Sequence, residues 1–354
     1  MNLYQSALFP FLQRFDAEQA HNLTLSLLQL AQGTAVGRWL LRSIAGDVPR
    51  QEVRLFGLTF PNILGVAAGF DKEAAVANGL ALLGFGHVEV GTVTPWPQAG
   101  NPRPRIFRLP GDRAVINRMG FPNEGMVRAA VRMRKMDRLQ PFVLGVSLGK
   151  QKETPLAQAA DDYVAVMRAV YPYADYLAVN ISSPNTPGLR ELQGSRYLEE
   201  LLDRLLEENH NEALRHQLRP RPLLLKIAPD LTWTELDEIL AAAIENGVSG
   251  MIATNTTTAR GGLRSTGAIK EESGGLSGAP LAARSNEVIR YIHRHTEGKL
   301  PIIGVGGVLD ARDAQAKLDA GASLIQVYTG FVYQGPGMAG RLLRELKNLR
   351  SAHD

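Results

Sequence analysis

Cysteine is absent from this chain of 354 residues. Its absence excludes disulfides, thiolate metal sites and a cysteine nucleophile, and it is typical of a reducing compartment. Long apolar runs are absent too: no stretch approaches the ~18 residues of a membrane-spanning helix, and the N-terminus lacks the basic and apolar regions of a signal peptide. The net charge of +4 is small for this length and does not indicate a nucleic-acid-binding protein.

Two further kinds of site find no support in the sequence. No histidine pair has the spacing of metal ligands, and no carboxylate pair has the arrangement that glycoside hydrolysis requires. Carboxylates are scarce where the predicted strands end: Asp71, Asp230 and Asp310 are present. The last two lie beside predicted helix starts, where we interpret them as helix caps or turn formers. We therefore expect no metal site.

The composition that remains, 45% hydrophobic and 21% charged, is that of a globular protein with a large core. After a predicted hairpin at 53–59, short β-prone runs alternate with helical patterns. The runs are 63–66, 87–91, 142–147, 176–180, 223–227, 250–254, 301–305 and 324–328; the helices are 73–83, 123–136, 156–170, 195–208, 232–246, 284–296, 311–320 and 337–350. Alternation predicts parallel βαβ units, and eight of them close a (β/α)8 TIM barrel. An open doubly wound sheet would alternate as well, but it has no reason to stop at eight.

The first 45 residues have a different pattern. Apolar side chains recur at helical spacing on both sides of Asp16, which is placed as an N-cap with Gln19 three residues later. We expect two short amphipathic helices, the first interrupted or restarted at Pro10. Their apolar faces either pack on the barrel, or they lie on a membrane surface or form a mouth for an apolar ligand. We therefore divide the chain into an N-terminal helical extension (1–45) and a barrel (46–354).

Long segments follow three of the predicted strands, at 92–122, 181–194 and 255–283. In a barrel these segments lie on the C-terminal face, where active sites are built. The strand ends there supply amides, hydroxyls and lysines, which suit a small anion with amide or imide groups. Lys226 emerges from an apolar strand and needs an anionic partner, for which a reduced flavin is one candidate. The glycines after the last two strands fit a phosphate site, whereas Leu309 breaks the dinucleotide pattern G-x-G-x-x-G.

Motifs in consistent order carry a resemblance to a known family. They are AAGFDK (67–72), GTVTPWPQAGNPRPRIFRL (91–109), NRMGF (117–121), NISSPNTPGLR (180–190), KIAPDL (226–231), TNTT (254–257), GGLSG (274–278), IIGVGGV (302–308) and YTGF (328–331). Together they resemble the dihydroorotate dehydrogenases, and more closely the quinone-dependent, membrane-associated class 2 enzymes. The match runs from about residue 45 to the C-terminus, and the N-terminal extension has the length and character of that class.

The resemblance implies oxidation of (S)-dihydroorotate to orotate in pyrimidine biosynthesis, with FMN as hydride acceptor and a membrane quinone as final acceptor. It implies FMN contacts at Ala68, Thr92, Ser147, Asn180, Lys226, Thr254, Gly278, Gly307, Tyr328 and Thr329. It implies substrate contacts at Lys72, Asn117, Arg118, Met119, Gly120, Phe121, Asn180, Asn185, Asn255 and Thr256.

Ser183 matches the base that removes the C5 proton, and Thr186 matches a residue of the relay that drains this proton. A serine is a weak base unless geometry and a proton acceptor help it. His21 and Arg108 match polar residues near the quinone head. The class further implies peripheral attachment to the cytoplasmic face of the cell membrane, and we expect a monomer.

This chain departs from the family pattern at Ser147, Pro122 and Phe70. At the first of these the family has an asparagine that contacts flavin, so we expect a shorter or water-mediated contact. Two rival hypotheses stay open: a different FMN barrel, such as a dihydropyrimidine or 2-hydroxy-acid oxidoreductase, and a membrane-docked binding protein that has lost its chemistry. The 2-hydroxy-acid oxidoreductase would need a histidine at a strand end, and His87 stands at a strand start, on the wrong face.

Overall fold

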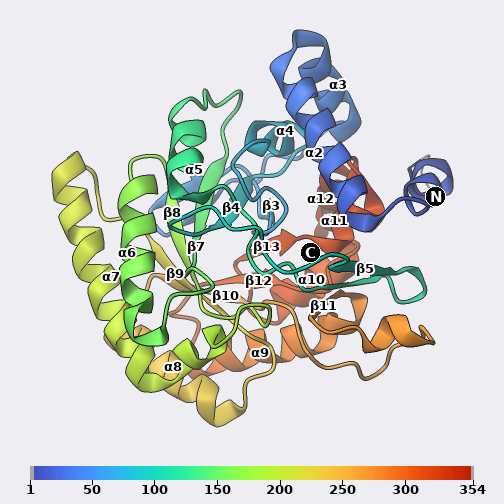
Figure 1. The fold of residues 1–354 in the computed structure, drawn as a ribbon. Helices are drawn as coiled ribbons and strands as arrows, with labels where there is room; N and C mark the ends of the chain where they lie inside the picture. The colour runs from blue at the N-terminus through green and yellow to red at the C-terminus, as the bar shows by residue number, and fades with distance from the viewer. Residues whose placement is uncertain (1–3, 352–354) are drawn as a thin grey trace.

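The computed structural model describes residues 4–351, and its centre is a closed barrel of parallel strands (Figure 1). In chain order the barrel strands are β3 (Leu64–Val66), β4 (His87–Val93), β7 (Val143–Leu148), β8 (Tyr176–Asn180), β9 (Leu223–Ile227), β10 (Gly250–Ala253), β12 (Ile302–Val305) and β13 (Leu324–Val327). β13 pairs with β3, which closes the ring. The predicted TIM barrel is therefore confirmed, and the open sheet is excluded.

Helices follow the strands and form the outer layer in Figure 1. They are α4 (Ala77–Leu82), α5 (Gly125–Arg134), α6 (Ala159–Val170), α7 (Ser195–His216), α8 (Trp233–Glu245), α9 (Ala282–His295), α10 (Ala311–Asp319), the short α11 (Thr329–Gln334) and α12 (Met338–Ser351). α4 begins later than predicted because the Asp71 carboxylate accepts hydrogen bonds from the backbone N–H groups of Ala75 and Val76, which form a turn first. The prediction ended α7 too early, at 208, whereas the helix continues to His216.

Glycines inside the barrel make room for large side chains on neighbouring strands. A Cβ atom on Gly145 would lie 2.0 Å from the ring of Tyr176, and one on Gly65 would lie 2.3 Å from the ring of His87. Both rings are fully buried. Such small–large pairing fills a barrel interior with side chains, so that ligands bind at its end and not along its axis.

Two smaller sheets accompany the barrel. The predicted hairpin is present as β1 (Val53–Leu55) and β2 (Leu58–Phe60). A three-stranded antiparallel sheet of β5 (Ile106–Leu109), β6 (Ala114–Asn117) and β11 (Gly275–Gly278) is built from two of the long segments that follow barrel strands. It joins residues 92–122 to residues 255–283, so that both segments reach the same end of the barrel.

The N-terminal region is more helical than predicted. A π-helical turn (Tyr4–Leu8) leads into α1 (Phe9–Leu12), and α2 (Ala17–Gly33) and α3 (Ala35–Ala45) follow as a hairpin (Figure 1). Asp16 is the N-cap of α2, as predicted, and accepts from the N–H groups of Glu18 and Gln19. The prediction missed α3, whose N-cap is Thr34. Pro10 lies in the first turn of α1, where it favours a helix start.

α2 packs on α4 and β5, and α3 packs on α4 and α12, yet much of the apolar surface of this hairpin stays exposed. Leu30 is 67% exposed and Trp39 is 66% exposed. Between residues 4 and 351, the helices all fall short of the length and apolarity needed to cross a membrane. The division of the chain at residue 45 stays a prediction.

Candidate active site

A deep cavity opens at the C-terminal end of the barrel, with about 1050 Å³ of empty space including its mouth. Of the residues predicted from the sequence, the following line it: Ala68, Lys72, Thr92, Asn117, Met119, Gly120, Phe121, Asn180, Ser183, Asn185, Lys226, Thr254, Asn255, Thr256, Gly278, Gly307, Tyr328 and Thr329.

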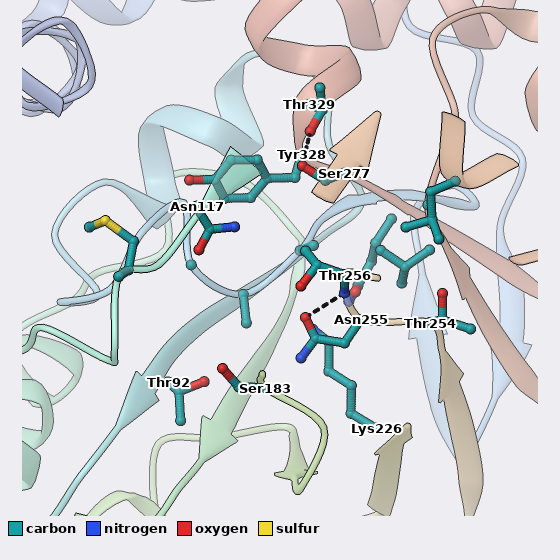
Figure 2. Close-up of a pocket in the computed structure, with 18 of the residues that line it drawn as sticks. Thr92, Asn117, Ser183, Lys226, Thr254, Asn255, Thr256, Ser277, Tyr328 and Thr329 are labelled. Carbon is teal, nitrogen blue, oxygen red and sulfur yellow. Dashed lines mark hydrogen bonds between the residues drawn. The ribbon is translucent and has the colours of Figure 1, made fainter. Parts of the chain in front are cut away.

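Figure 2 shows the side chains at the two ends of the cavity. Ser277 and Thr329 lie at one end, where the Thr329 hydroxyl donates to Ser277 Oγ over 2.8 Å. Thr92, Ser183 and Lys226 lie at the other end, near the tips of three different barrel strands. Hydroxyl groups therefore lie at both ends, and the ammonium group of Lys226 lies at the second.

Amides and hydroxyls form a connected set around Asn180. The Asn180 amide donates to Thr92 Oγ1 over 2.8 Å, and its oxygen accepts from the Ser182 hydroxyl. The Asn185 amide donates to Asn117 Oδ1 over 3.2 Å, and its backbone N–H donates to Ser183 Oγ over 3.2 Å. These contacts hold the loop after β8 (residues 181–194, here the Ser183 loop) against the segment 117–121, so that both line one cavity.

Of the residues predicted to contact FMN or substrate or to relay the proton, three lie outside the cavity. Arg118 turns away from it: its guanidinium pairs with Glu272 at 2.5 Å and stacks on the Phe107 ring. Ser147 is fully buried behind Thr92, and the two hydroxyl oxygens are 2.9 Å apart. A role of Ser147 toward a ligand would therefore act through Thr92. Thr186 is also buried, and its hydroxyl has no hydrogen-bond partner among residues 4–351.

Lys226 has a partner that sequence reasoning missed. Its ammonium lies 3.0 Å from Glu89 Oε1, inside the barrel. Glu89 is on β4 and also accepts from the Tyr176 hydroxyl and the Gln326 amide. Burial alone would raise the pKa of Glu89, but the Lys226 charge and these hydrogen bonds hold it below its usual range. The anionic partner expected for Lys226 is therefore supplied by the chain itself; a lone carboxylate within the apolar run of β4 was the available signal.

The glycine-rich turn after β12 has the geometry of a phosphate site. Gly306 and Gly307 have φ values of +114° and +78°, and a Cβ on Gly307 would lie 2.4 Å from Ala282 at the start of α9. The backbone thus approaches a helix N-terminus closely, where N–H groups and the helix dipole favour an anion. The buried Thr254 hydroxyl, which lines the same cavity, finds no partner within the described part of the chain.

Lys72 and His21 lie close enough for their charges to interact. Burial is the main cause that lowers the pKa of Lys72 to about 8, and the charges of Glu18 and Arg105 act on it in opposite directions. Burial and the Lys72 charge lower the pKa of His21 to about 3, so His21 is neutral at physiological pH. The His21 ring packs edge-on against Phe70.

The two predicted quinone residues lie outside the cavity: His21 is part of α2, and Arg108 contacts the turn between α1 and α2. Arg108 donates to the carbonyl oxygens of Leu12 and Phe15, and so holds the turn between α1 and α2. His21 Nε2 is buried without a partner in residues 4–351. Arg108 thus has a structural role whatever else it binds.

The structure confirms the predicted helix-capping role for one of two aspartates outside the cavity and not for the other. Asp310 caps α10 in a capping box with Asp313, as predicted. Asp230 is not a helix cap: it accepts from the Thr258 N–H and pairs with Arg190 at 2.8 Å, which ties the loop after β8 to the loop after β10. Thr232 caps α8 instead. Residues 4–351 hold no His, Asp and Glu cluster that fits a metal ion.

Comparisons with known proteins agree on one family. The sequence profile described as "Dihydroorotate dehydrogenase" matches residues 50–349. A protein of Synechococcus sp. named "Dihydroorotate dehydrogenase (quinone)" is 49% identical, with 98% of this chain and 94% of that protein covered. A protein of the same name from Roseiflexus castenholzii is 51% identical, with 96% and 91% covered. A crystal structure of DHODH from Eimeria tenella in complex with ferulenol has a TM-score of 0.84 and 38% identity, and covers 96% of this chain and 92% of that one.

The strand order, the cavity at the C-terminal end of the barrel and these comparisons lead to one assignment: this chain belongs to the dihydroorotate dehydrogenase family.

Proposed function

We propose that this chain oxidises (S)-dihydroorotate to orotate, using bound FMN and a membrane quinone, in pyrimidine biosynthesis. Enzymes of this family are flavin-dependent, and its relatives at about half identity carry the name of the quinone-linked enzyme. The hypothesis of a binding protein without catalysis has less support, because most of the polar side chains expected at the site, including Ser183 and Lys226, line the cavity.

FMN fits the cavity in both chemistry and layout. Its phosphate would be held at the end formed by Gly278, Gly307 and Thr329, through backbone N–H groups and a hydroxyl. Its ring would lie toward Thr92, Thr254 and Lys226, where the Thr254 hydroxyl has no protein partner in the described chain. When bound, FMN supplies the acceptor for the hydride that leaves C6 of dihydroorotate.

The protein's own groups bind and deprotonate the substrate. The ammonium of Lys72 would neutralise the substrate carboxylate, and the amides of Asn117, Asn185 and Asn255 would bind the edges of the pyrimidine ring, because an amide donates and accepts side by side. Ser183 Oγ takes the proton from C5, which the adjacent ring carbonyl makes acidic. As Ser183 gains this proton, its own hydroxyl proton would pass to Thr186 and on along a relay to solvent; the buried Thr186 hydroxyl has no hydrogen-bond partner in residues 4–351 that would compete for this role.

Quinone reduction needs access for an apolar ligand, and the α2–α3 hairpin offers it. Its exposed apolar side chains include Leu23, Leu27, Leu30, Val36, Trp39 and Leu40. Such a surface suits peripheral attachment to a bilayer. We place it on the cytoplasmic face of the membrane, with His21 and Arg108 near the quinone head, and we expect a monomer.

One observation carries the proposal: Ser183, Lys72 and the asparagine amides converge on the cavity that also contains the glycine-rich turn. Anaerobic addition of dihydroorotate to the purified yellow protein tests it. We expect the flavin band to bleach and a short-chain quinone to restore it. A band that does not bleach contradicts the reaction; bleaching without recovery contradicts only the quinone step.

A further inference from the structure

Asn101 joins the two segments that carry the proposed substrate contacts. Its backbone N–H donates to the Met119 carbonyl over 2.9 Å. Its side-chain amide donates to the carbonyls of Arg118 and Asn185, each over 3.0 Å. A Cβ atom on Gly120 would lie 2.8 Å from this amide, so Asn101 packs directly on the 117–121 segment. One side chain therefore holds segment 117–121 and the Ser183 loop together.

The contact with Asn185 is close to the reacting group. The N–H of Asn185 donates to Ser183 Oγ, and its side chain donates to Asn117 Oδ1. A shift of the Asn185 peptide would therefore move the proposed base and a proposed substrate contact together. Asn101 itself is not among the residues that line the cavity, so it can act on the reaction only through these neighbours.

Asn101 is held in turn by a buried ion pair. Arg105 Nη1 donates to the Asn101 carbonyl over 2.8 Å. Arg105 also donates to both oxygens of Glu18 on α2, over 2.9 and 2.7 Å. Glu18 and Arg105 are 6% and 5% exposed. Paired in this bidentate way, a buried guanidinium and carboxylate fix each other's geometry.

We propose that Asn101 is a positioning residue that clamps the Ser183 loop onto segment 117–121, and that the Glu18–Arg105 pair anchors this clamp to α2. The proposal rests on the function proposed above. It gives α2 a role in the reaction with dihydroorotate as well as in quinone access.

The variant Asn101→Asp tests the clamp, because it removes both amide N–H donors at almost unchanged size. We expect its flavin content, and the rate at which a short-chain quinone reoxidises it, to stay at the wild-type level. We expect flavin reduction by saturating dihydroorotate to slow by about 10- to 100-fold, since small misplacements of reacting groups have effects of this order. A merely structural role would lower the flavin content and both rates together. Reduction at the wild-type rate overturns the proposal.

A matched pair of variants tests the anchor on α2. Glu18→Gln breaks the pair with Arg105. Arg103→Gln removes the second partner of Glu18; the Arg103 side chain is 68% exposed, so its ion pair contributes little to stability. Measurements at about pH 6.5, below the Lys72 pKa of about 8, reduce the effect that loss of the Glu18 charge has on Lys72 itself, since this charge raises the pKa of Lys72. We expect Glu18→Gln to slow flavin reduction as Asn101→Asp does, and Arg103→Gln to match the wild type. Equal rates in Glu18→Gln and Arg103→Gln overturn the link to α2.

The rate of trypsin cleavage after Arg190 measures how firmly the Ser183 loop is held, and this measurement does not depend on the enzymatic reaction. We expect faster cleavage at this bond in Asn101→Asp than in the wild type, because the loop has lost one of its anchors. Unchanged cleavage contradicts the clamp. This readout separates the two proposals: if dihydroorotate fails to reduce even the wild type, the proposed function is wrong, while the cleavage result still decides whether Asn101 holds the loop.

Discussion

The ammonium of Lys226 lies 3.0 Å from the carboxylate of Glu89, and both side chains are buried at the centre of the barrel. The Tyr176 hydroxyl and the Gln326 amide complete the hydrogen bonding of Glu89. Lys226 therefore enters the cavity already neutralised by the protein, in a fixed position. A cofactor bound in the cavity would contact an ammonium donor whose position is fixed by Glu89.

Glu89→Gln should destabilise the flavin-free protein by about 3–5 kcal/mol, because it leaves the Lys226 charge buried without a counter-charge. Urea unfolding of the apoprotein measures this. The double variant Glu89→Gln/Lys226→Met removes both charges and should recover most of the stability while still binding flavin poorly. A single variant as stable as the wild type would show that the ion pair contributes nothing.

Gly307→Ala should abolish flavin retention. A Cβ atom there would lie 2.4 Å from Ala282, in the turn proposed to hold the phosphate. Gly262→Ala is the matched control, because its φ of +77° is almost that of Gly307, +78°, yet a Cβ atom on Gly262 would meet nothing within 4 Å. The flavin-to-protein absorbance ratio after purification measures retention. If both variants keep flavin equally, the close approach at Gly307 is not part of the site.

Orotate binding should weaken as the pH rises through about 8. Burial lowers the pKa of Lys72 to about 8, and only the protonated form neutralises a carboxylate. Affinity is therefore full below this pKa and falls by about tenfold for each pH unit well above it. Titration calorimetry across this range measures the effect. Lys72→Met should bind weakly at every pH, and a wild type without any pH dependence there would refute the contact.

Acid should destabilise the protein through His87. Burial lowers the pKa of His87 to about 4 from its usual 6.5, so the unfolded chain binds a proton that the folded chain excludes. Stability is therefore full above pH 6.5 and is lost as the pH falls toward 4, by about 1.4 kcal/mol at pH 5.5. His87→Leu should lose less stability than the wild type between pH 7.5 and 5.5 in urea unfolding. An equal loss in both would contradict this assignment.

Much of the barrel could be predicted from the sequence. Buried parallel strands are near-continuous apolar runs, so their positions could be identified, and strand ends of a barrel always share one face. Asn117, Ser183 and Lys226 could therefore be placed at one cavity without any coordinates. The resemblance to a family added their proposed roles, which position alone does not give.

Long-range pairing explains most of what could not be predicted. Glu89 is 137 residues from Lys226, and Asn101 is 84 residues from Asn185. No local pattern indicates such contacts. Arg118 shows a second limit: it lies between two residues that line the cavity, yet its side chain turns outward to Glu272. The place of a residue in the chain determines which segment reaches the cavity, whereas packing determines which of its side chains point inward.

The rate of flavin reduction in Ser183→Ala tests the account most directly. Single-turnover stopped flow with saturating dihydroorotate at neutral pH measures this rate, and the flavin content and orotate affinity of the variant serve as controls. We expect both controls to match the wild type and the rate to fall by at least about 100-fold, the lower range for loss of a general base. Reduction at the wild-type rate would contradict the assignment of Ser183 as the base.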